Sequence, residues 1–411
     1  METKIRCAII GLGRIASILE EDKLREKPAT HAGAITTHPQ TTLLAGADID
    51  AVRRAQFKKR WKTPHLYTDA ATLLKKHAVD ILHIATPPKS HPALLRLAAR
   101  RNVPVVVLEK PVTTNTALVK SFLREQRHYV KNVIVNHERR FAKDYRMVKT
   151  FIDAPKSENY GTLLSMTGRF YSQAPKKSLD LLLHDGTHLI DAMFFFLEHD
   201  PAAYFNEVLS HFLRKNVIAL PISDFYVQLQ KHHPLKVSSQ KTRKQHSALK
   251  SPPHPHIPLI KIPSQLAKNR NENSVRQSPT VSRDLPGETL NLLFSYHQTK
   301  QKRKIPIAVE LGSGRHYFHF EIILNFTQGR VHIGNGLLRF ERARPSPYYD
   351  NFHSLVLEHK KPYQKTYPFK NMMQEAVDLY LNRKSLTSSP LTSALMPIAL
   401  SEKIQTFFKN H

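Results

Sequence analysis

Hydrophobic residues in the first third of the chain fall into short apolar runs separated by amphipathic stretches. The runs IRCAIIG, TTLLAGADID, DILHIAT, VPVVVLEKP and NVIVN are typical of strands. The stretches DAATLLKKHA, HPALLRLAARRN and NTALVKSFLREQRHY have the apolar spacing of helices. Apolar strands that alternate with helices predict a parallel sheet covered on both faces, since an antiparallel sheet with one wet face would show polar alternation.

A second pattern begins near Arg140. A helix-like stretch, DYRMVKTFID, precedes the strand-like runs TLLSMTGRFY, NLLFSYHQ, IPIAVELG, YFHFEIILNF and GRVHIG, and breaks such as TQG resemble hairpin turns. Two later stretches, NMMQEAVDLYLN and SALMPIALSEKIQTFF, have helical periodicity. We therefore expect an α/β chain with a parallel-sheet domain at residues 1–136 and an α+β domain with a mainly antiparallel sheet at residues 137–411.

The composition shifts sharply between residues 231 and 290. This segment holds eight prolines, eleven Lys or Arg and three Asp or Glu, in runs such as SPPHPHIPLIKIPS. It is too polar and too rich in proline to fold alone, so we expect a disordered basic insertion between two strands. A tolerated surface loop is the favoured interpretation, and an anion-binding tether is the alternative.

Composition and charge restrict the class of protein. The hydrophobic fraction of 41% and the charged fraction of 23% are ordinary for a globular chain, but 62 Lys and Arg against 33 Asp and Glu give a net charge of +29. Such a surplus of positive charge favours binding to polyanions, or it reflects a source proteome that is basic throughout. The single cysteine, Cys7, cannot form an intrachain disulfide, and we expect no signal peptide and no membrane span, hence a cytoplasmic protein.

The stretch AIIGLGRIAS carries a candidate phosphate-binding turn. Gly11, Gly13 and Ala16 have G-x-G-x-x-A spacing directly after a predicted strand and before an expected helix. Small residues permit a tight turn, and the N–H groups at the helix start can face a pyrophosphate. The alternative is a glycine turn inside another kind of α/β domain. The candidate cofactor contacts of this turn are Gly11, Leu12, Gly13, Arg14, Ile15 and Ala16.

The next predicted strand ends at an acidic residue, Asp48. A carboxylate at that place can accept both ribose hydroxyls, which favours NAD over NADP. Asp48 lies 35 positions after Gly13 instead of the usual ~20, because a long first crossover intervenes. Arg53 and Arg54 follow it and could reach a 2′-phosphate, so NADP stays open.

With GLGRIA, HIATPPKSH, VLEKP and HDGTHLID in this order, the chain resembles the glucose–fructose oxidoreductase / inositol dehydrogenase (Gfo/Idh/MocA) family. The likeness covers nearly the whole chain apart from residues 231–290, and E-K-P is its most specific element. The resemblance implies an NAD(P)-binding Rossmann domain, a substrate and oligomerisation domain, and an active site in the cleft between them. It also implies a homo-oligomeric NAD(P)-dependent oxidoreductase that moves a hydride between nicotinamide and a hydroxyl or keto carbon of a sugar, cyclitol or sugar derivative.

Carried over residue by residue, the lysine of E-K-P is Lys110, with Glu109 beside it as a further candidate for cofactor binding. The family signature D-x-G-x-H-x-x-D is matched at Gly186, His188 and Asp191, but His184 stands where the leading aspartate is usual. This departure puts the substrate-orienting role of that carboxylate in doubt. ATPPKSH corresponds to the turn along the nicotinamide, with candidates Thr86, Pro87 and His91; candidate substrate contacts are Asn136, His137, Asp185 and His188.

Three interpretations compete for the segment HDGTHLID. His184, His188 and Asp191 lie on one helical face and imitate a zinc pattern, but Gly186 weakens the helix and the usual glutamate base is absent. The same residues could be purely structural. We favour proton chemistry, with His188 as the base, Lys110 on the same substrate oxygen, and His184 sharing the proton; no metal is expected.

A rival function from another class stays open. A non-catalytic nucleotide sensor or polyanion-binding protein on the same fold would retain the glycine turn, and His184 in place of the aspartate lends it weight. We nevertheless expect a sugar or polyol substrate and no nucleic-acid partner.

Overall fold

The computed structural model describes residues 4–154, 160–173, 177–198, 201–215, 218, 220–232, 287–298, 303–360 and 364–410. Most of the insertion expected at 231–290 lies outside the described residues. Its two ends are strand residues instead, because Lys231 pairs with Glu288 and His232 pairs with Gly287. The expected limits of the insertion were therefore wrong at both ends: strand pairing extends further than composition indicates.

The first sheet has six parallel strands in the order β3-β2-β1-β4-β5-β6. The strand order reverses between β1 and β4, and the carboxyl ends of strands at such a point form the usual ligand crevice of an open α/β sheet. Strands β4, β5 and β6 are buried at every position, which explains their continuous apolar sequences. The strands are β1 Ile5–Ile10, β2 Thr41–Ala47, β3 His65–Tyr67, β4 Ile81–Ile84, β5 Val105–Leu108 and β6 Val133–Val135.

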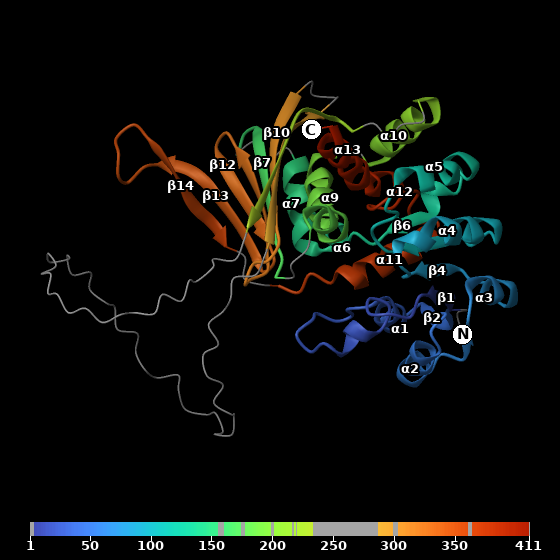
Figure 1. Cartoon of the computed structure of the whole chain (residues 1–411). Coiled ribbons are helices and arrows are strands. Elements are labelled where there is room, and N and C mark those ends of the chain that lie inside the picture. Colours follow the sequence, from blue (N-terminus) through green and yellow to red (C-terminus); the bar gives the residue numbers. More distant parts are fainter. Residues whose placement is uncertain are drawn as a thin grey trace, which may run out of the picture.

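Helices cover both faces of this sheet (Figure 1). Phe57 of α2 belongs to the core on one face, and Leu95 of α4 and Phe122 of α5 belong to the core on the other. The expected parallel sheet with two covered faces is thereby confirmed. The helices of this domain are α1 His31–Thr37, α2 Ala51–Trp61, α3 Ala70–Lys76, α4 His91–Arg100 and α5 Thr116–Glu125, and the 3-10 turns are Ile18–Glu21, Pro88–Ser90 and Val130–Asn132.

Helix α11, Pro368–Tyr380, returns from late in the chain to complete the first core. Its side chains Phe369, Met372 and Met373 share a buried cluster with α1 and with the strands of the first sheet. We propose residues 136/137 as the point where the chain first crosses between the domains. A single division at that point assigns α11 to the second domain by sequence, whereas α11 packs on the first domain.

The second sheet has eight strands in the order β14-β13-β12-β11-β7-β10-β9-β8. Every neighbouring pair is antiparallel except β7 and β10, which are parallel. The expected mainly antiparallel sheet is therefore confirmed, with three additional strands, β8, β13 and β14. The strands are β7 Leu163–Tyr171, β8 Ile222–His232, β9 Gly287–Gln298, β10 Arg303–Gly312, β11 His319–Phe326, β12 Gly329–Gly334, β13 Leu337–Pro345 and β14 His353–Lys360.

Helices α7, α9 and α13 lie between this sheet and the first domain (Figure 1). In β11, Phe320, Ile322, Leu324 and Phe326 face them, and the alternate residues are only half-buried. The opposite face carries ion pairs such as Arg330 Nε to Glu341 Oε2 at 2.7 Å. The helices are α6 Glu138–Phe141, α7 Lys143–Asp153, α8 Ser178–Leu181, α9 Thr187–Leu197, α10 Pro201–Lys215, α12 Leu391–Ala394 and α13 Met396–Asn410.

Within the described ranges, no helix has the length and apolar character needed to cross a membrane.

Candidate functional site

The glycine turn begins at a position that only glycine can occupy. Gly11 has φ of +85°, and a Cβ on it would lie 2.8 Å from the backbone of Ala85 and Thr86. Gly13 is different, because a Cβ there would meet only Arg53, at 3.9 Å. The turn therefore packs closely on the end of β4 at Gly11 and leaves open space above Gly13, where a phosphate group would need to approach the backbone.

The segment after this turn differs from the expected helix. Residues 14–17 form turns and residues Ile18–Glu21 form a 3-10 helix, and the first α-helix starts only at His31. The prediction of a helix directly after Ala16 is therefore wrong. The physical reason lies in the length of the crossover: Leu12 and Ala16 are anchored in the core, but the backbone from Asp22 onward loops out before returning at His31.

Asp48 is fixed against the glycine turn. Its Oδ2 accepts the N–H of Leu12 at 2.7 Å, and its Oδ1 accepts the N–H of Asp50 at 2.9 Å. The carboxylate is nearly buried, and the guanidinium of Arg53 comes within 3.9 Å of it. The structure thus joins the two parts of the predicted nucleotide site, as the sequence interpretation requires.

The turn after β4 was predicted to line the cofactor at Thr86, Pro87 and His91. Thr86 is half-buried and Pro87 is exposed, so both stay candidates. His91 is buried, and both of its ring nitrogens face carbonyl oxygens: Nε2 that of Thr86 at 2.8 Å, and Nδ1 that of Pro111 at 3.1 Å. Burial also lowers its pKa. A neutral ring donates to one of these carbonyls, and backbone encloses both nitrogens, so the structure does not support the cofactor contact predicted for His91.

Lys110 reaches the second domain. It follows β5 directly, and its Nζ donates a hydrogen bond of 2.7 Å to the backbone carbonyl oxygen of His184. An ammonium group has three donors, so one bond to a carbonyl leaves two for a substrate. The two motifs that stand 74 residues apart in the sequence are therefore in direct contact.

The segment that receives Lys110 is a π-helical turn, Leu182–Gly186, which continues directly into α9. π-turns of this kind are rare and often lie at functional sites. The side chain of His184 is exposed and that of Asp185 is half-buried. His184 thus contributes its carbonyl oxygen to the contact, and the catalytic role predicted for its imidazole stays a prediction.

His188 lies on the first turn of α9, beside this contact. Burial lowers its pKa well below the ordinary value, and the nearby positive charges of Lys110 and Arg139 lower it further. Its Nδ1 is buried, and none of the described residues gives it a hydrogen-bond partner. The imidazole is therefore neutral at pH 7, which is the state that accepts a proton.

Two further candidates have unpaired buried atoms next to Lys110. The Oδ1 of Asn136 and the Nε2 of His137 have no hydrogen-bond partner among the described residues, and the Nδ1 of His137 lies 3.5 Å from Asp191 Oδ2. The ring of His137 also lies edge-on to that of His188, with centroids 6.0 Å apart. Buried polar atoms are normally paired, so such a group of unpaired atoms indicates a place that a ligand or water completes.

The sequence interpretation missed Arg139. Its guanidinium stacks on the ring of Phe320, 3.6 Å from the centroid, and donates to Asn335 Oδ1 at 3.3 Å. It lies close enough to His188 for its charge to affect the pKa of that imidazole. The RR pair in VNHERRF was the only available signal, and spacing alone could not tell which arginine faces the site.

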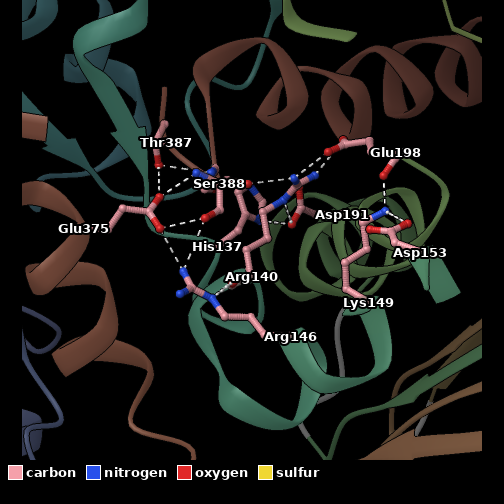
Figure 2. Close-up of polar contacts among 11 residues, drawn as sticks. His137, Arg140, Arg146, Lys149, Asp153, Asp191, Glu198, Glu375, Thr387 and Ser388 are labelled. Atoms are coloured by element: carbon pink, nitrogen blue, oxygen red, sulfur yellow. Dashed lines mark hydrogen bonds and ion pairs between the residues drawn. The ribbon is translucent and has the colours of Figure 1, made fainter. Parts of the chain in front are cut away.

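The second arginine of that pair, Arg140, is structural. It is fully buried and binds Asp191 through Nε, at 2.8 and 3.0 Å, and Glu198 through Nη1 and Nη2, at 2.9 and 3.0 Å. Figure 2 shows this network together with a second one around Glu375. Asp191 is therefore an ion-pair partner that ties α9 to α6, which favours the structural interpretation for this residue.

The alternative metal site would need Asp191 together with the two histidines of HDGTHLID. Its carboxylate is taken by Arg140. Over the described part of the chain, no group of three or more His, Cys, Asp or Glu side chains is arranged to hold a metal ion.

A cleft of about 400 Å³ opens next to Arg139. It lies between α6, the start of α7, the β12–β13 turn and the segment before α11. Charged and amide groups share its wall with the ring of Tyr145, and burial raises the pKa of Asp144 there. Its polar lining residues are Glu138, Arg139, Asp144, Asn335 and Thr366.

The residues at the edge of the first sheet fit a nicotinamide dinucleotide. Gly13 leaves room above the turn, and Asp48 is held with a carboxylate at the end of the neighbouring strand. The unpaired atoms of Asn136 and His137 come directly after β6, which lies on the opposite side of the β1–β4 switch point from Asp48. Residues that would hold the cofactor are thus Gly11 to Ala16, Asp48, Thr86, Pro87 and Lys110.

Comparison with known proteins agrees with this geometry. Residues 5–137 match a family described as oxidoreductases with an NAD-binding Rossmann fold, GFO_IDH_MocA. Oxidoreductase P35 of Formosa agariphila is 27% identical over 156 residues, which are 38% of this chain and 44% of that protein. The match therefore spans less than half of that relative.

Solved structures share the whole fold at low sequence identity. A dehydrogenase from Chromobacterium violaceum has a TM-score of 0.65 at 12% identity, over 100% of this chain and 98% of the other. A myo-inositol dehydrogenase from Corynebacterium glutamicum has a TM-score of 0.58 at 14% identity, over 98% and 96%. The two-domain fold expected from the resemblance is thus confirmed.

Proposed function

Because its N-terminal domain, residues 5–137, places this chain in the Gfo/Idh/MocA family of NAD-binding oxidoreductases, we propose that the protein transfers a hydride between nicotinamide and a hydroxyl or keto carbon of a sugar, cyclitol or sugar derivative. The hydrogen bond from Lys110 to His184 carries the proposal, because it brings E-K-P and HDGTHLID to one place. NAD is the expected cofactor, and NADP is the alternative.

The bound cofactor would accept the hydride of the alcohol or donate it to the ketone. The protein must then handle one proton on the substrate oxygen. His188, neutral and with its Nδ1 buried, accepts this proton during oxidation. Lys110 donates hydrogen bonds to the same oxygen and polarises the carbonyl in the reverse direction.

The two groups work as a pair because they share an electrostatic environment. The charge of Lys110 lowers the pKa of His188, so the imidazole is neutral and able to accept the hydroxyl proton while Lys110 donates hydrogen bonds to the same oxygen.

The cleft beside Arg139 has the groups that bind a polyol, although Lys110, His184 and His188 are not among its lining residues. Its volume of about 400 Å³ exceeds that of a monosaccharide, and carboxylate, guanidinium and amide groups line it together with one aromatic ring. Such groups are those that hydrogen-bond hydroxyls and stack on the apolar face of a sugar ring. His184, in place of an aspartate, would contact the substrate through its exposed ring.

A substrate panel tests the proposal. Purified protein with NAD or NADP is mixed with sugars, nucleotide sugars and inositols, and the absorbance of the reduced nicotinamide is followed. We expect turnover of at least one polyol, which Lys110→Ala abolishes. NADH binding without turnover of any member, in either direction, would instead support the nucleotide sensor.

Location and assembly belong to the same proposal. We propose a cytoplasmic enzyme that associates through the second domain.

A further inference from the structure

Four buried polar side chains form a connected chain beneath Lys110. His83 Nδ1 lies 2.9 Å from His31 Nδ1, and His31 Nε2 lies 2.9 Å from Glu109 Oε1. Asn136 Nδ2 donates to the same carboxylate oxygen at 2.6 Å. All four are buried, with exposed fractions of 0% for the two histidines, 7% for Glu109 and 3% for Asn136. The proton chemistry proposed above uses none of the first three.

Matching donors to acceptors assigns the protons of this chain. An ionised Glu109 only accepts, so His31 must donate through Nε2. A neutral His31 then accepts at Nδ1, and His83 donates to it from Nδ1. His83 Nε2 is left without a proton, and it is the one ring nitrogen of the pair that has no partner among the described residues.

The opposite assignment leaves a buried donor unpaired. If His31 were doubly protonated, it would donate to both neighbours, and His83 would carry its proton on Nε2. That N–H would be buried with no acceptor in the described part of the chain. An unpaired buried donor costs more free energy than an unpaired buried acceptor. The geometry therefore assigns a neutral His31 and a network with one net negative charge, on Glu109.

Glu109 stays ionised although it is buried. Burial opposes its ionisation, but its hydrogen bond and charge interaction with His31, the hydrogen bond from Asn136 and the charge of Lys110 keep its pKa below the ordinary value. Burial lowers the pKa of His83 well below its ordinary value, so this imidazole is neutral.

Other titratable groups face Glu109 as well. Burial lowers the pKa of His91, and it lowers that of His137 to about 4, so both rings are neutral at pH 7. Lys110 is the neighbouring cation, and its Nζ is directed away, to the carbonyl oxygen of His184.

The position of Glu109 decides what its charge can act on. A dinucleotide crosses a sheet of this strand order at the switch point between β1 and β4. Its adenosine ribose belongs with Asp48, after β2. The nicotinamide half therefore belongs on the other side, over the ends of β4 and β5, where Glu109 lies.

We propose that His83 and His31 keep Glu109 as a buried, ionised carboxylate that makes the site bind oxidised nicotinamide, whose ring is positively charged, in preference to the neutral reduced ring. This inference rests on the proposed function only as far as cofactor binding. A unit charge at roughly 10 Å, acting through an effective dielectric constant near 20, changes the ratio of the two affinities on the order of tenfold.

The test compares the dissociation constants of NAD⁺ and NADH by calorimetry. We expect Glu109→Gln to raise the ratio Kd(NAD⁺)/Kd(NADH) about tenfold, since it removes the charge. His83→Val removes a neutral partner and leaves the charge of Glu109 in place, so it should leave the ratio near the wild-type value. His77→Asn is the control: this histidine, bonded to Tyr67 at 2.8 Å, precedes β4 at the opposite edge of the sheet and should leave the ratio unchanged.

An unchanged ratio in Glu109→Gln would overturn the inference. A second measurement needs no variant: in ¹⁵N-histidine-labelled protein, two-bond ¹⁵N–¹H spectra should show His83 protonated on Nδ1 and His31 on Nε2. A proton on Nε2 of His83 would also overturn it. Failure of the wild type to bind either nicotinamide would overturn the proposed function instead, so the two failures are distinguishable.

Discussion

The ammonium group of Lys110 and the carbonyl oxygen of His184 lie 2.7 Å apart, and this contact joins the two domains at the place where the chemistry is proposed. The carbonyl belongs to a π-helical turn, a distortion that is rare and often lies at functional sites. The helix distortion thus supplies the acceptor that fixes the direction of the lysine.

Removal of the lysine amine should reduce turnover and spare cofactor binding. In Lys110→Ala, loss of the donor to the reacting oxygen is expected to lower kcat by about 10²–10⁴. The measurements are NAD(H)-coupled absorbance on the substrate found in the panel, and NADH fluorescence for the dissociation constant. Lys75→Ala, on an exposed turn of α3, is the matched control and should change neither quantity. Full turnover in Lys110→Ala would contradict the assignment.

Alanine substitutions of the two glycines in the turn should affect different properties, stability at Gly11 and cofactor binding at Gly13. Gly11→Ala introduces a Cβ at 2.8 Å from backbone atoms at positive φ, so we expect a loss of about 1–3 kcal/mol in the free energy of unfolding. Gly13→Ala has room in the protein and should keep its stability but weaken NADH binding. Urea denaturation and NADH titration separate the two effects, and equal stability of both variants would contradict this account.

Asp48 should decide between NAD and NADP. Its carboxylate is held by two backbone N–H groups, and Arg53 and Arg54 stand next to it. In Asp48→Ser the ratio of NADH to NADPH affinity should fall at least about tenfold, because the acceptor of the ribose hydroxyls is lost and repulsion of a 2′-phosphate is removed. Calorimetry with both cofactors measures this. Asp22→Asn, at an exposed acidic residue, is the control.

His137 should make the protein less stable in mild acid. Burial lowers its pKa from 6.5 to about 4. Between these values the unfolded chain binds more protons than the folded one, so the free energy of unfolding falls as the pH falls from 6.5 to 4. His137→Asn should reduce this slope by up to about 1.4 kcal/mol per pH unit, measured by urea denaturation at several pH values. His353→Asn, an exposed histidine, should leave the slope as it is.

Arg140 should be the most costly single residue of Figure 2 to remove. Arg140→Ala leaves the carboxylates of Asp191 and Glu198 buried without a counter-charge, and breaking a buried pair in this way costs about 3–5 kcal/mol. Chemical denaturation measures the loss. A combined Arg140→Met, Asp191→Asn, Glu198→Gln protein should regain part of it, because the uncompensated charges are gone; no recovery would mean that packing rather than charge is responsible.

Local sequence was sufficient to predict the parallel sheet, since β4 and β5 are continuous apolar runs whose period and composition leave little choice. It could not predict that α11 packs on that sheet, because an amphipathic helix does not specify which core receives its apolar face. The helix expected after Ala16 failed for a related reason: the glycine spacing indicates a turn but not the length of the element that follows.

At the candidate site, the family resemblance supplied Lys110 and His188 as candidates, and the contact between their segments is long-range. The resemblance did not anticipate that the ring nitrogens of His91 face backbone carbonyls, because a histidine beside a cofactor turn can equally hold two backbone segments together. The role of Arg139 and the chain from His83 to Glu109 depend on side-chain directions across several elements, and a linear pattern does not contain that information.

Helix α11 also has a consequence for how the chain is made. Phe369 at its start touches the ring of His31, and Met372 and Met373 fill the same face of the first sheet. A nascent chain that contains only the nucleotide-binding half therefore exposes the apolar surface that α11 later covers, until residue 380 has left the ribosome. During translation that exposed surface is available for chaperone binding.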